Sequence, residues 1–146
     1  MTLVDRTDPS QTDAIAFEIE LAHAPAKVWR ALTDPDLLTQ WLLPTVGHRL
    51  QPGAEFQFKT QPQPGWDGVV NCRYLEIEPE KKISWAWVVG DIDTVVTITM
   101  QPVASGTRLD IVQAGFRPDQ KQNFGGARYG WKMMGTKLID VLGTLA

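Results

Sequence analysis

The chain contains 146 residues, of which 43% are hydrophobic and 21% charged, and its formal net charge is −3. These values are typical of a single globular domain and argue against disorder or a coiled coil. The charges form no basic cluster, so we expect no nucleic acid as a partner and no attraction to anionic membrane surfaces. Because no window approaches the ~20 apolar residues of a membrane-spanning helix, we also expect no stable membrane insertion.

The amino-terminal residues and the cysteine content indicate the compartment. Cys72 is the single cysteine, so it cannot form an internal disulfide. The amino terminus is polar rather than basic and then apolar, unlike a secretory signal. We therefore expect a cytoplasmic protein. Residues 1–13 mix charges, Pro9 and turn formers and are predicted to be a flexible lead-in, followed by a single domain over residues 14–146.

The first regular element is a strand, because apolar and polar residues alternate from about Ala14 to Ala22. Two short helices are predicted after it. Pro25 suits the first turn of the first helix. The second helix is expected from Pro35 to Trp41, with Asp34 as its cap.

From residue 54 onward the period changes from helical to alternating, which predicts five further strands. They cover residues 54–58, 68–77, 82–88, 94–101 and 107–114. Short, turn-rich connections join them, so an antiparallel meander is expected. Together with the first strand they make a sheet of six strands.

A long carboxy-terminal helix is predicted after the last strand, because apolar residues recur there with helical spacing and form one broad stripe. Asp119, followed three residues later by Gln122, resembles a capping arrangement for its start. The sheet is the element large enough to cover the stripe. Gly125, Gly126 and Gly130 cost roughly 1 kcal/mol each relative to Ala inside a helix, and they suggest a bend, a late start or a close approach to the sheet.

Five motifs, occurring in order, resemble the helix-grip superfamily, also called SRPBCC or START-like, which includes START lipid-binding domains and the birch-pollen-allergen fold. Within it, the chain is most similar to the branch named for the activator of the heat shock protein 90 ATPase. The motifs are APAKVWRALTDPDLLTQWLLP (Ala24 to Pro44), PGAEFQF (Pro52 to Phe58), GVVNCRYLEIEPEKKISWAW (Gly68 to Trp87), GTRLDIVQAGF (Gly106 to Phe116) and GWKMMGTKLIDVLG (Gly130 to Gly143).

The resemblance implies an α+β helix-grip fold: a curved six-stranded antiparallel sheet wrapped around a long C-terminal helix, with two short helices between strands one and two. It implies little about chemistry, since the superfamily hosts lipid carriers, hormone receptors and cyclases. The eukaryotic activator has a separate amino-terminal region that helps engage its chaperone, whereas this chain begins its core strand at about residue 14. We therefore expect no chaperone contact.

Residues for catalysis or metal binding are sparse. His23 and His48 are the two histidines, and both lie at ends of elements beside proline or glycine turns, where exposure is expected. With one cysteine and two distant histidines, no metal-ligand spacing occurs. Gly126-xxx-Gly130 lies within a helical pattern and indicates a packing groove rather than a phosphate cradle. We therefore assign no catalytic residue, no metal and no cofactor.

Acidic residues occur at turns or on the solvent side of strands. Asp67 lies in a turn, and the pairs Glu76/Glu78 and Asp91/Asp93 lie at strand ends. An acid and base pair for catalysis is one interpretation of them. Solvated surface charge is the better one.

The case for a pocket rests on which side chains face the helix. If Leu75 and Ile77 point inward, then Asn71 and Arg73 on the same strand do too, provided that no bulge shifts the register. Parity places Gln113 on the inner face as well. A buried polar group without partners is costly, so these side chains either satisfy one another and trapped water or line a ligand cavity.

Aromatic side chains are the expected walls of that cavity, and six tryptophans are unusual in so small a chain. The indole in the Gly65–Gly68 turn has two interpretations: it closes over the mouth of the cavity, or it belongs to a plain satellite cluster. The predicted ligand-binding residues are Trp41, Phe56, Phe58, Trp66, Asn71, Arg73, Trp85, Trp87, Gln113 and Trp131. The alternative is that these aromatic side chains simply fill the core.

Three functions stay open. The first is a binding protein for a small hydrophobic or amphipathic, lipid-like molecule held between sheet and helix. The second is a cyclase- or hydrolase-like enzyme, in which Arg73, Asn71 and Gln113 orient a substrate in the same cavity and water transfers the proton. Its weakness is the missing base. The third, a chaperone-interaction module, rests on the family name alone. A homodimer also stays open.

Overall fold

A computed structural model describes residues 2–145 of the chain. The strands are β1 (Thr2–Asp5), β2 (Ala14–Leu21), β3 (Thr45–Val46), β4 (Glu55–Lys59), β5 (Val69–Glu78), β6 (Lys82–Val89), β7 (Ile92–Val103) and β8 (Gly106–Ala114). The helices are α1 (Pro25–Thr33), α2 (Pro35–Trp41) and α3 (Lys121–Thr144), and a short 3₁₀ turn, η1 (Pro118–Gln120), precedes α3.

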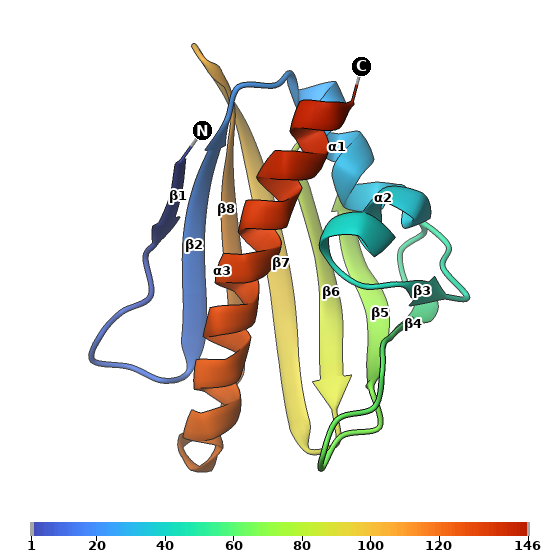
Figure 1. The fold of residues 1–146 in the computed structure, drawn as a ribbon, viewed down its shortest axis with the longest axis vertical. Coiled ribbons are helices and arrows are strands. Elements are labelled where there is room, and N and C mark those ends of the chain that lie inside the picture. Colours follow the sequence, from blue (N-terminus) through green and yellow to red (C-terminus); the bar gives the residue numbers. More distant parts are fainter. Residues whose placement is uncertain (1, 146) are drawn as a thin grey trace.

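One antiparallel sheet contains these strands in the order β1-β2-β8-β7-β6-β5-β4-β3. The sheet curves around α3, with α1 and α2 beside the carboxy-terminal half of that helix (Figure 1). This arrangement confirms the predicted α+β helix-grip fold. It forms because each strand turns alternate, mostly apolar side chains toward the helix and the intervening ones outward.

The number of strands is eight in the described residues rather than the predicted six. Strand β1 lies within the segment predicted as a flexible lead-in and pairs with β2, with Leu3 opposite Ile19. Strand β3 comprises two residues and pairs with β4. Both additions lie at the edges of the sheet. Segments this short have too few residues to display an alternating pattern, so periodicity does not detect them.

The two short helices lie where the sequence predicts them. The Asp34 carboxylate accepts a hydrogen bond from the backbone N–H of Asp36 at 2.9 Å and so caps α2. The indole N–H of Trp41 donates to the carbonyl of Ala31 at 2.8 Å. That carbonyl belongs to the last turn of α1, where no further helical N–H is available. Trp41 therefore joins α1 to α2.

The start of α3 differs from the prediction. Asp119 and Gln122 do not cap it, since α3 begins at Lys121 without a side-chain cap. Gln120 caps the preceding 3₁₀ turn instead: its side-chain oxygen accepts a hydrogen bond from the backbone N–H of Arg117 at 2.9 Å and stabilises η1. The helix begins at Lys121 and includes Gly125, Gly126 and Gly130, so the late start that these glycines suggested does not occur.

Close approach of backbone to sheet occurs at a glycine that the sequence did not single out. A Cβ atom at Gly125 or Gly126 would meet nothing within 4 Å. A Cβ atom at Gly135 would lie 3.1 Å from Leu3 and 3.3 Å from Ile19. The tight contact of α3 with the sheet edge is therefore at Gly135, where β1 and β2 pass beneath the helix.

The register of β5 contains the bulge on which the face assignment depended. Tyr74 is opposite Trp85 and Glu76 is opposite Ser84, so Leu75 is an extra residue. One inserted residue reverses which side chains face inward on either side of it. The inward residues before the bulge are therefore Val70, Cys72 and Tyr74, all of them buried.

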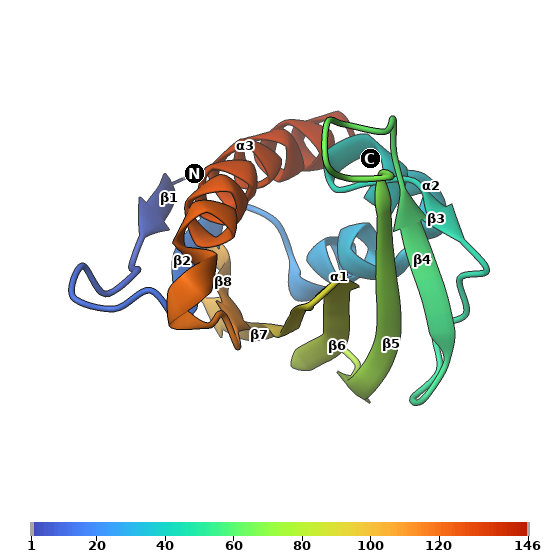
Figure 2. The same cartoon turned by 90° about the horizontal axis from the view of Figure 1, so that it is seen from below.

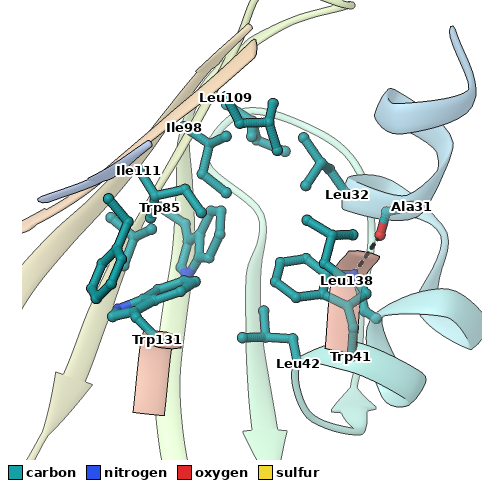
Figure 3. Packing of buried hydrophobic residues seen from close by; sticks show 14 of the residues in the cluster. Ala31, Leu32, Trp41, Leu42, Trp85, Ile98, Leu109, Ile111, Trp131 and Leu138 are labelled. Carbon is teal, nitrogen blue, oxygen red and sulfur yellow. Dashed lines mark hydrogen bonds between the residues drawn. The ribbon is translucent and has the colours of Figure 1, made fainter. Parts of the chain in front are cut away.

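The interior has two ends. At the first, α1, α2 and the carboxy-terminal half of α3 pack together; we call this the closed end, and its buried side chains include Leu32, Trp41 and Leu138 (Figure 3). At the second, the β4–β5 connection, the β6–β7 turn and the first turns of α3 come together; we call this the open end. The open end faces the viewer in Figure 2. None of the helices in residues 2–145 combines the length and apolar character needed to cross a membrane.

Candidate ligand-binding site

A cavity of about 700 Å³ lies at the open end, between the sheet and the amino-terminal half of α3. This volume falls within the range of small-molecule sites, roughly 300–1,000 Å³. Its apolar walls include Trp66 from the β4–β5 connection, Val70 from β5 and Trp87 from β6. Phe116, which follows β8, also belongs to them. The fold therefore brings together at one place apolar side chains that are far apart in the sequence.

Gln113 is a buried polar group in the wall of this cavity, with only 2% of its surface exposed. Its side-chain oxygen accepts from the indole N–H of Trp131 at 2.7 Å. Its side-chain nitrogen donates to Oγ1 of Thr94 at 2.9 Å. The Thr94 hydroxyl donates in turn to the backbone carbonyl of Trp87 at 2.8 Å.

These partners fix the orientation of the Gln113 amide. An indole N–H can only donate, so the amide oxygen must face Trp131. The Thr94 hydroxyl donates its single proton to a carbonyl, so it must accept from the amide nitrogen. The prediction that Gln113 faces inward is confirmed by its burial, and the two alternatives for a buried amide both apply: it has protein partners and it lines a cavity.

The two indoles of the wall are held in place. Trp66 donates from its N–H to the backbone carbonyl of Val69 at 3.0 Å, which fixes the turn over the mouth of the cavity. Trp87 is half-buried, and its ring lies 5.6 Å from that of Phe58 and 6.1 Å from that of Trp131. Such contacts between rings stabilise a defined wall.

The rim of the cavity is fastened to the start of α3. The side-chain nitrogen of Gln120 donates to the backbone carbonyl of Asp91 at 3.2 Å. Arg117 forms an ion pair with the Asp91 carboxylate at 3.0 Å. Because Gln120 is buried and Arg117 is exposed, the hydrogen bond of Gln120 is the stronger constraint. The β6–β7 turn and η1 therefore form one side of the mouth.

Four of the predicted site residues lie at this cavity. Trp66, Trp87 and Gln113 line it as described, and Asn71 also borders it, although the Asn71 side chain lies on the outer face of the sheet. Trp131 is fully buried behind Gln113 and holds the amide. The structure thus assembles part of the predicted set at one site.

The other predicted aromatic residues fill the core. Trp41 belongs to the closed end, and the ring of Phe56 lies 5.5 Å from that of Phe58 on the sheet. Trp85 is buried, and its indole nitrogen has no hydrogen-bond partner in the described residues. These aromatic side chains therefore fill the core, as the alternative to a cavity wall proposed.

The inward orientation considered for Asn71 and Arg73 is wrong, and the bulge at Leu75 is the reason. Both side chains are exposed on the outer face of the sheet. Asn71 accepts there from the side-chain amide of Gln57 at 2.9 Å. Both residues line a more open groove of about 630 Å³ on the outer side of the sheet.

The histidines are less exposed than the sequence predicts, because each is half-buried. Nε2 of His48 lies 2.7 Å from the hydroxyl of Tyr74. Burial lowers the pKa of His48, and the charge of Asp34 partly opposes that change. Burial also lowers the pKa of His23, with Lys27 acting in the same direction. Neither histidine lines the cavity.

Burial also removes Cys72 as a nucleophile. It raises the pKa of the Cys72 thiol to about 12, so the reactive thiolate is scarce at neutral pH. In the part of the chain that the structure describes, no three His, Cys, Asp or Glu side chains are arranged to hold a metal ion.

Several wall residues were not predicted. Val70 follows from the alternation of β5 once Cys72 and Tyr74 are taken as the inward set, so the sequence contained that signal. Phe116 lies between a strand and a helix, after Gly115, whose φ of +116° turns the chain. Its ring lies 5.4 Å from that of Phe124. An isolated apolar residue in a connection has no periodicity, so pattern reasoning does not detect it.

Comparison with known proteins agrees with the fold. Residues 22–143 match the family described as Activator of Hsp90 ATPase homolog 1-like protein. Protein MLL2253 from Mesorhizobium loti is 35% identical, with 91% of this chain and 98% of that chain covered and a TM-score of 0.85. Protein NE0264 from Nitrosomonas europaea is 26% identical over 94% of this chain and 98% of that chain, with a TM-score of 0.76. CalU16 from Micromonospora echinospora, at 23% identity, has the same fold over 98% of this chain and 85% of that chain, with a TM-score of 0.74. No curated protein gave a significant match.

Proposed function

Because the chain belongs to the family described as Activator of Hsp90 ATPase homolog 1-like protein, whose fold is consistent with ligand binding, we propose that it binds a small apolar or amphipathic molecule in the open-end cavity. The observation that carries the proposal is the combination of a cavity of about 700 Å³ with a buried amide in its wall, Gln113, whose orientation is fixed by its hydrogen bonds. Apolar walls supply affinity, and a few placed polar groups supply orientation.

Binding is favoured over catalysis by the residues around the cavity. Among the described residues, no histidine lines it, and its two acidic residues, Asp67 and Asp91, are exposed. A general acid or base is usually a group whose surroundings shift its pKa, within reach of the substrate. The enzyme hypothesis had Arg73 and Asn71 orient a substrate, and both are on the outer face. The arrangement therefore supports binding.

Nile red tests the proposal, because it is an uncharged dye whose emission rises on transfer to apolar surroundings. We expect saturable binding with one site per chain and quenching of tryptophan fluorescence, since Trp66 and Trp87 line the cavity.

Two neighbouring glycines provide a matched pair of variants. Gly126 lines the cavity, whereas Gly125 does not, and a Cβ atom at either position would meet nothing within 4 Å. Gly126→Phe should fill the space and abolish binding, while Gly125→Phe should leave binding intact, with both variants folded by circular dichroism. Absence of dye binding to the unmodified protein, or equal loss in both variants, would contradict the proposal.

A further inference from the structure

The charged residues that line the cavity are of one sign. Among the described residues that line it, only Asp67 and Asp91 are charged, and both lie at the mouth. Asp67 accepts from the backbone N–H of Val69 at 3.1 Å, and Asp91 is paired with Arg117 at 3.0 Å. No lysine, arginine or histidine of residues 2–145 lines the cavity, and Arg117, beside its mouth, is already paired with Asp91.

The Gln113 amide, which lines the cavity, has hydrogen-bonding capacity that its protein partners do not use. A primary amide has two N–H donors and an oxygen with two lone pairs. In the described residues, one N–H is used by Thr94 and one lone pair by Trp131. One donor and one acceptor therefore remain on a side chain that is only 2% exposed. A ligand group that can both accept and donate, such as a hydroxyl or an amide, matches them.

We infer that the ligand is an uncharged, largely apolar molecule whose hydroxyl or amide group reaches Gln113, and that the cavity rejects organic anions. The inference rests on the proposed function and narrows its ligand class. An anion bound with its charge inward would be desolvated without a partner, which is costly. An anion bound with its charge outward would lie near the exposed Asp67 and the paired Asp91 and would gain no favourable ion pair from the lining residues.

A cation is the alternative that the acidic mouth raises. An ammonium group near Trp66 or Trp87 would gain from the ring faces. Asp91 is already paired, however, and both acidic residues are exposed, where water and salt screen such interactions. Gln113 is the most deeply buried polar residue of the lining and is uncharged. An ammonium group can donate to its free lone pair but cannot accept from its free N–H. An uncharged ligand therefore matches both the mouth of the cavity and the Gln113 amide in its wall.

Three probes of nearly equal shape test the charge preference: naphthalenemethanol, naphthoate and naphthylmethylammonium. We expect naphthalenemethanol to bind, naphthoate to bind at least about tenfold more weakly, and the ammonium compound to bind no more tightly than the alcohol. Dissociation constants come from tryptophan quenching at neutral pH, and native mass spectrometry gives the stoichiometry.

A gain-of-function variant sharpens the test. Asn123 is exposed and lines the cavity, so Asn123→Lys places a cation at the mouth. It should raise naphthoate affinity about three- to tenfold without improving the alcohol. Thr136→Lys adds the same charge on an exposed part of α3 that does not line the cavity, and it should change neither.

The contact with Gln113 has its own measurement. In heteronuclear NMR spectra, the side-chain amide signals of Gln113, assigned from their loss in Gln113→Leu, should shift with naphthalenemethanol but not with methylnaphthalene. Methylnaphthalene lacks the hydroxyl. Equal shifts with both probes, or no shift with either, would overturn the hydrogen-bond part of the inference.

The outcomes separate this inference from the proposed function. Naphthoate binding as tightly as the alcohol, or the ammonium compound binding more tightly, overturns the inference and leaves ligand binding in place. The same conclusion follows if all three probes fail while Nile red binds. If Nile red fails as well, both the inference and the proposed function are overturned.

Discussion

The two ends of α3 have different surroundings in one continuous helix. At the closed end Leu138 and Leu142 are completely buried beside α1 and α2. At the open end the helix carries Gly125 and Gly126 in open space and borders a cavity. The difference shows that the helix-grip fold does not by itself determine whether the space between sheet and helix is filled or left as a cavity. Side-chain volume decides: large residues fill one end, and glycines leave the other unfilled.

The largest effect expected from this comparison is the loss of a tryptophan from the closed end. Trp41 is 1% exposed and joins α1 to α2 through its N–H. Trp41→Ala should lower the free energy of unfolding by about 3–5 kcal/mol, through lost burial and the space left behind. Trp87→Ala, at the half-buried open end, should cost clearly less and weaken Nile red binding. Guanidinium denaturation measures both.

The comparison of the ends would fail if the two tryptophan variants lost similar stability. It would also fail if Trp41→Ala weakened dye binding as strongly as Trp87→Ala while remaining folded. Both results would mean that the interior is uniformly packed and that the cavity wall is ordinary core.

The next effect concerns the polar network behind the cavity. Gln113→Leu leaves the buried N–H of Trp131 without its acceptor, so we expect a loss of about 1–3 kcal/mol in unfolding free energy. The same substitution at Gln101, an exposed residue of β7, should change stability by less than about 0.5 kcal/mol. Equal effects at the two positions would show that the network adds nothing beyond side-chain burial.

The fold was predictable from the sequence because its signals are periodic. The alternation in β2 and the stripe of α3 extend over many residues, so each pattern is supported several times. The site was less predictable, because it depends on single residues. Leu75 is one inserted residue, yet it decides that Asn71 and Arg73 face outward. Nothing in the composition of β5 marks a bulge, and a shift of one residue reverses every face.

Gln113 could be placed correctly because β8 has regular alternation without a bulge in its pairing with β7. Its partners could not be predicted in the same way. Thr94 and Trp131 come from β7 and α3, and their contact with Gln113 depends on the rotation of the helix over the sheet. The division of the aromatic residues between core and cavity wall depends on the same geometry.

A smaller effect contrasts the glycines of the two halves of α3. Gly125→Ala should stabilise the protein by about 1 kcal/mol, because alanine favours the helix and the new methyl group meets nothing. Gly135→Ala should gain less, since its Cβ atom would lie 3.1 Å from Leu3. Thermal or chemical denaturation of the two variants measures the difference. An equal gain would mean that β1 yields freely and that the closed end is not tightly packed there.

The smallest effect is a pH dependence at the edge of the closed end, where His48 lies against Tyr74 and near Asp34. Burial lowers the pKa of His48 from its ordinary value of 6.5, so the folded state favours the neutral ring. The unfolded chain therefore binds more protons as the pH falls. The contribution of His48 to stability is fully present at pH values above its unfolded pKa of 6.5 and is lost as the pH falls below that value. The unfolding free energy should therefore decrease as the pH is lowered from about 7.5 to about 5.5.

His48→Gln should make this decrease shallower, because glutamine can still bond to the Tyr74 hydroxyl but does not titrate. His23→Gln is a companion variant, because burial also lowers the pKa of His23. It should remove a separate part of the pH dependence. The double variant should then be the flattest of the series. If His48→Gln retained the full slope of the unmodified protein, the ring would be hydrated in the folded state, and the closed end would be open to water at the point where His48 covers Tyr74.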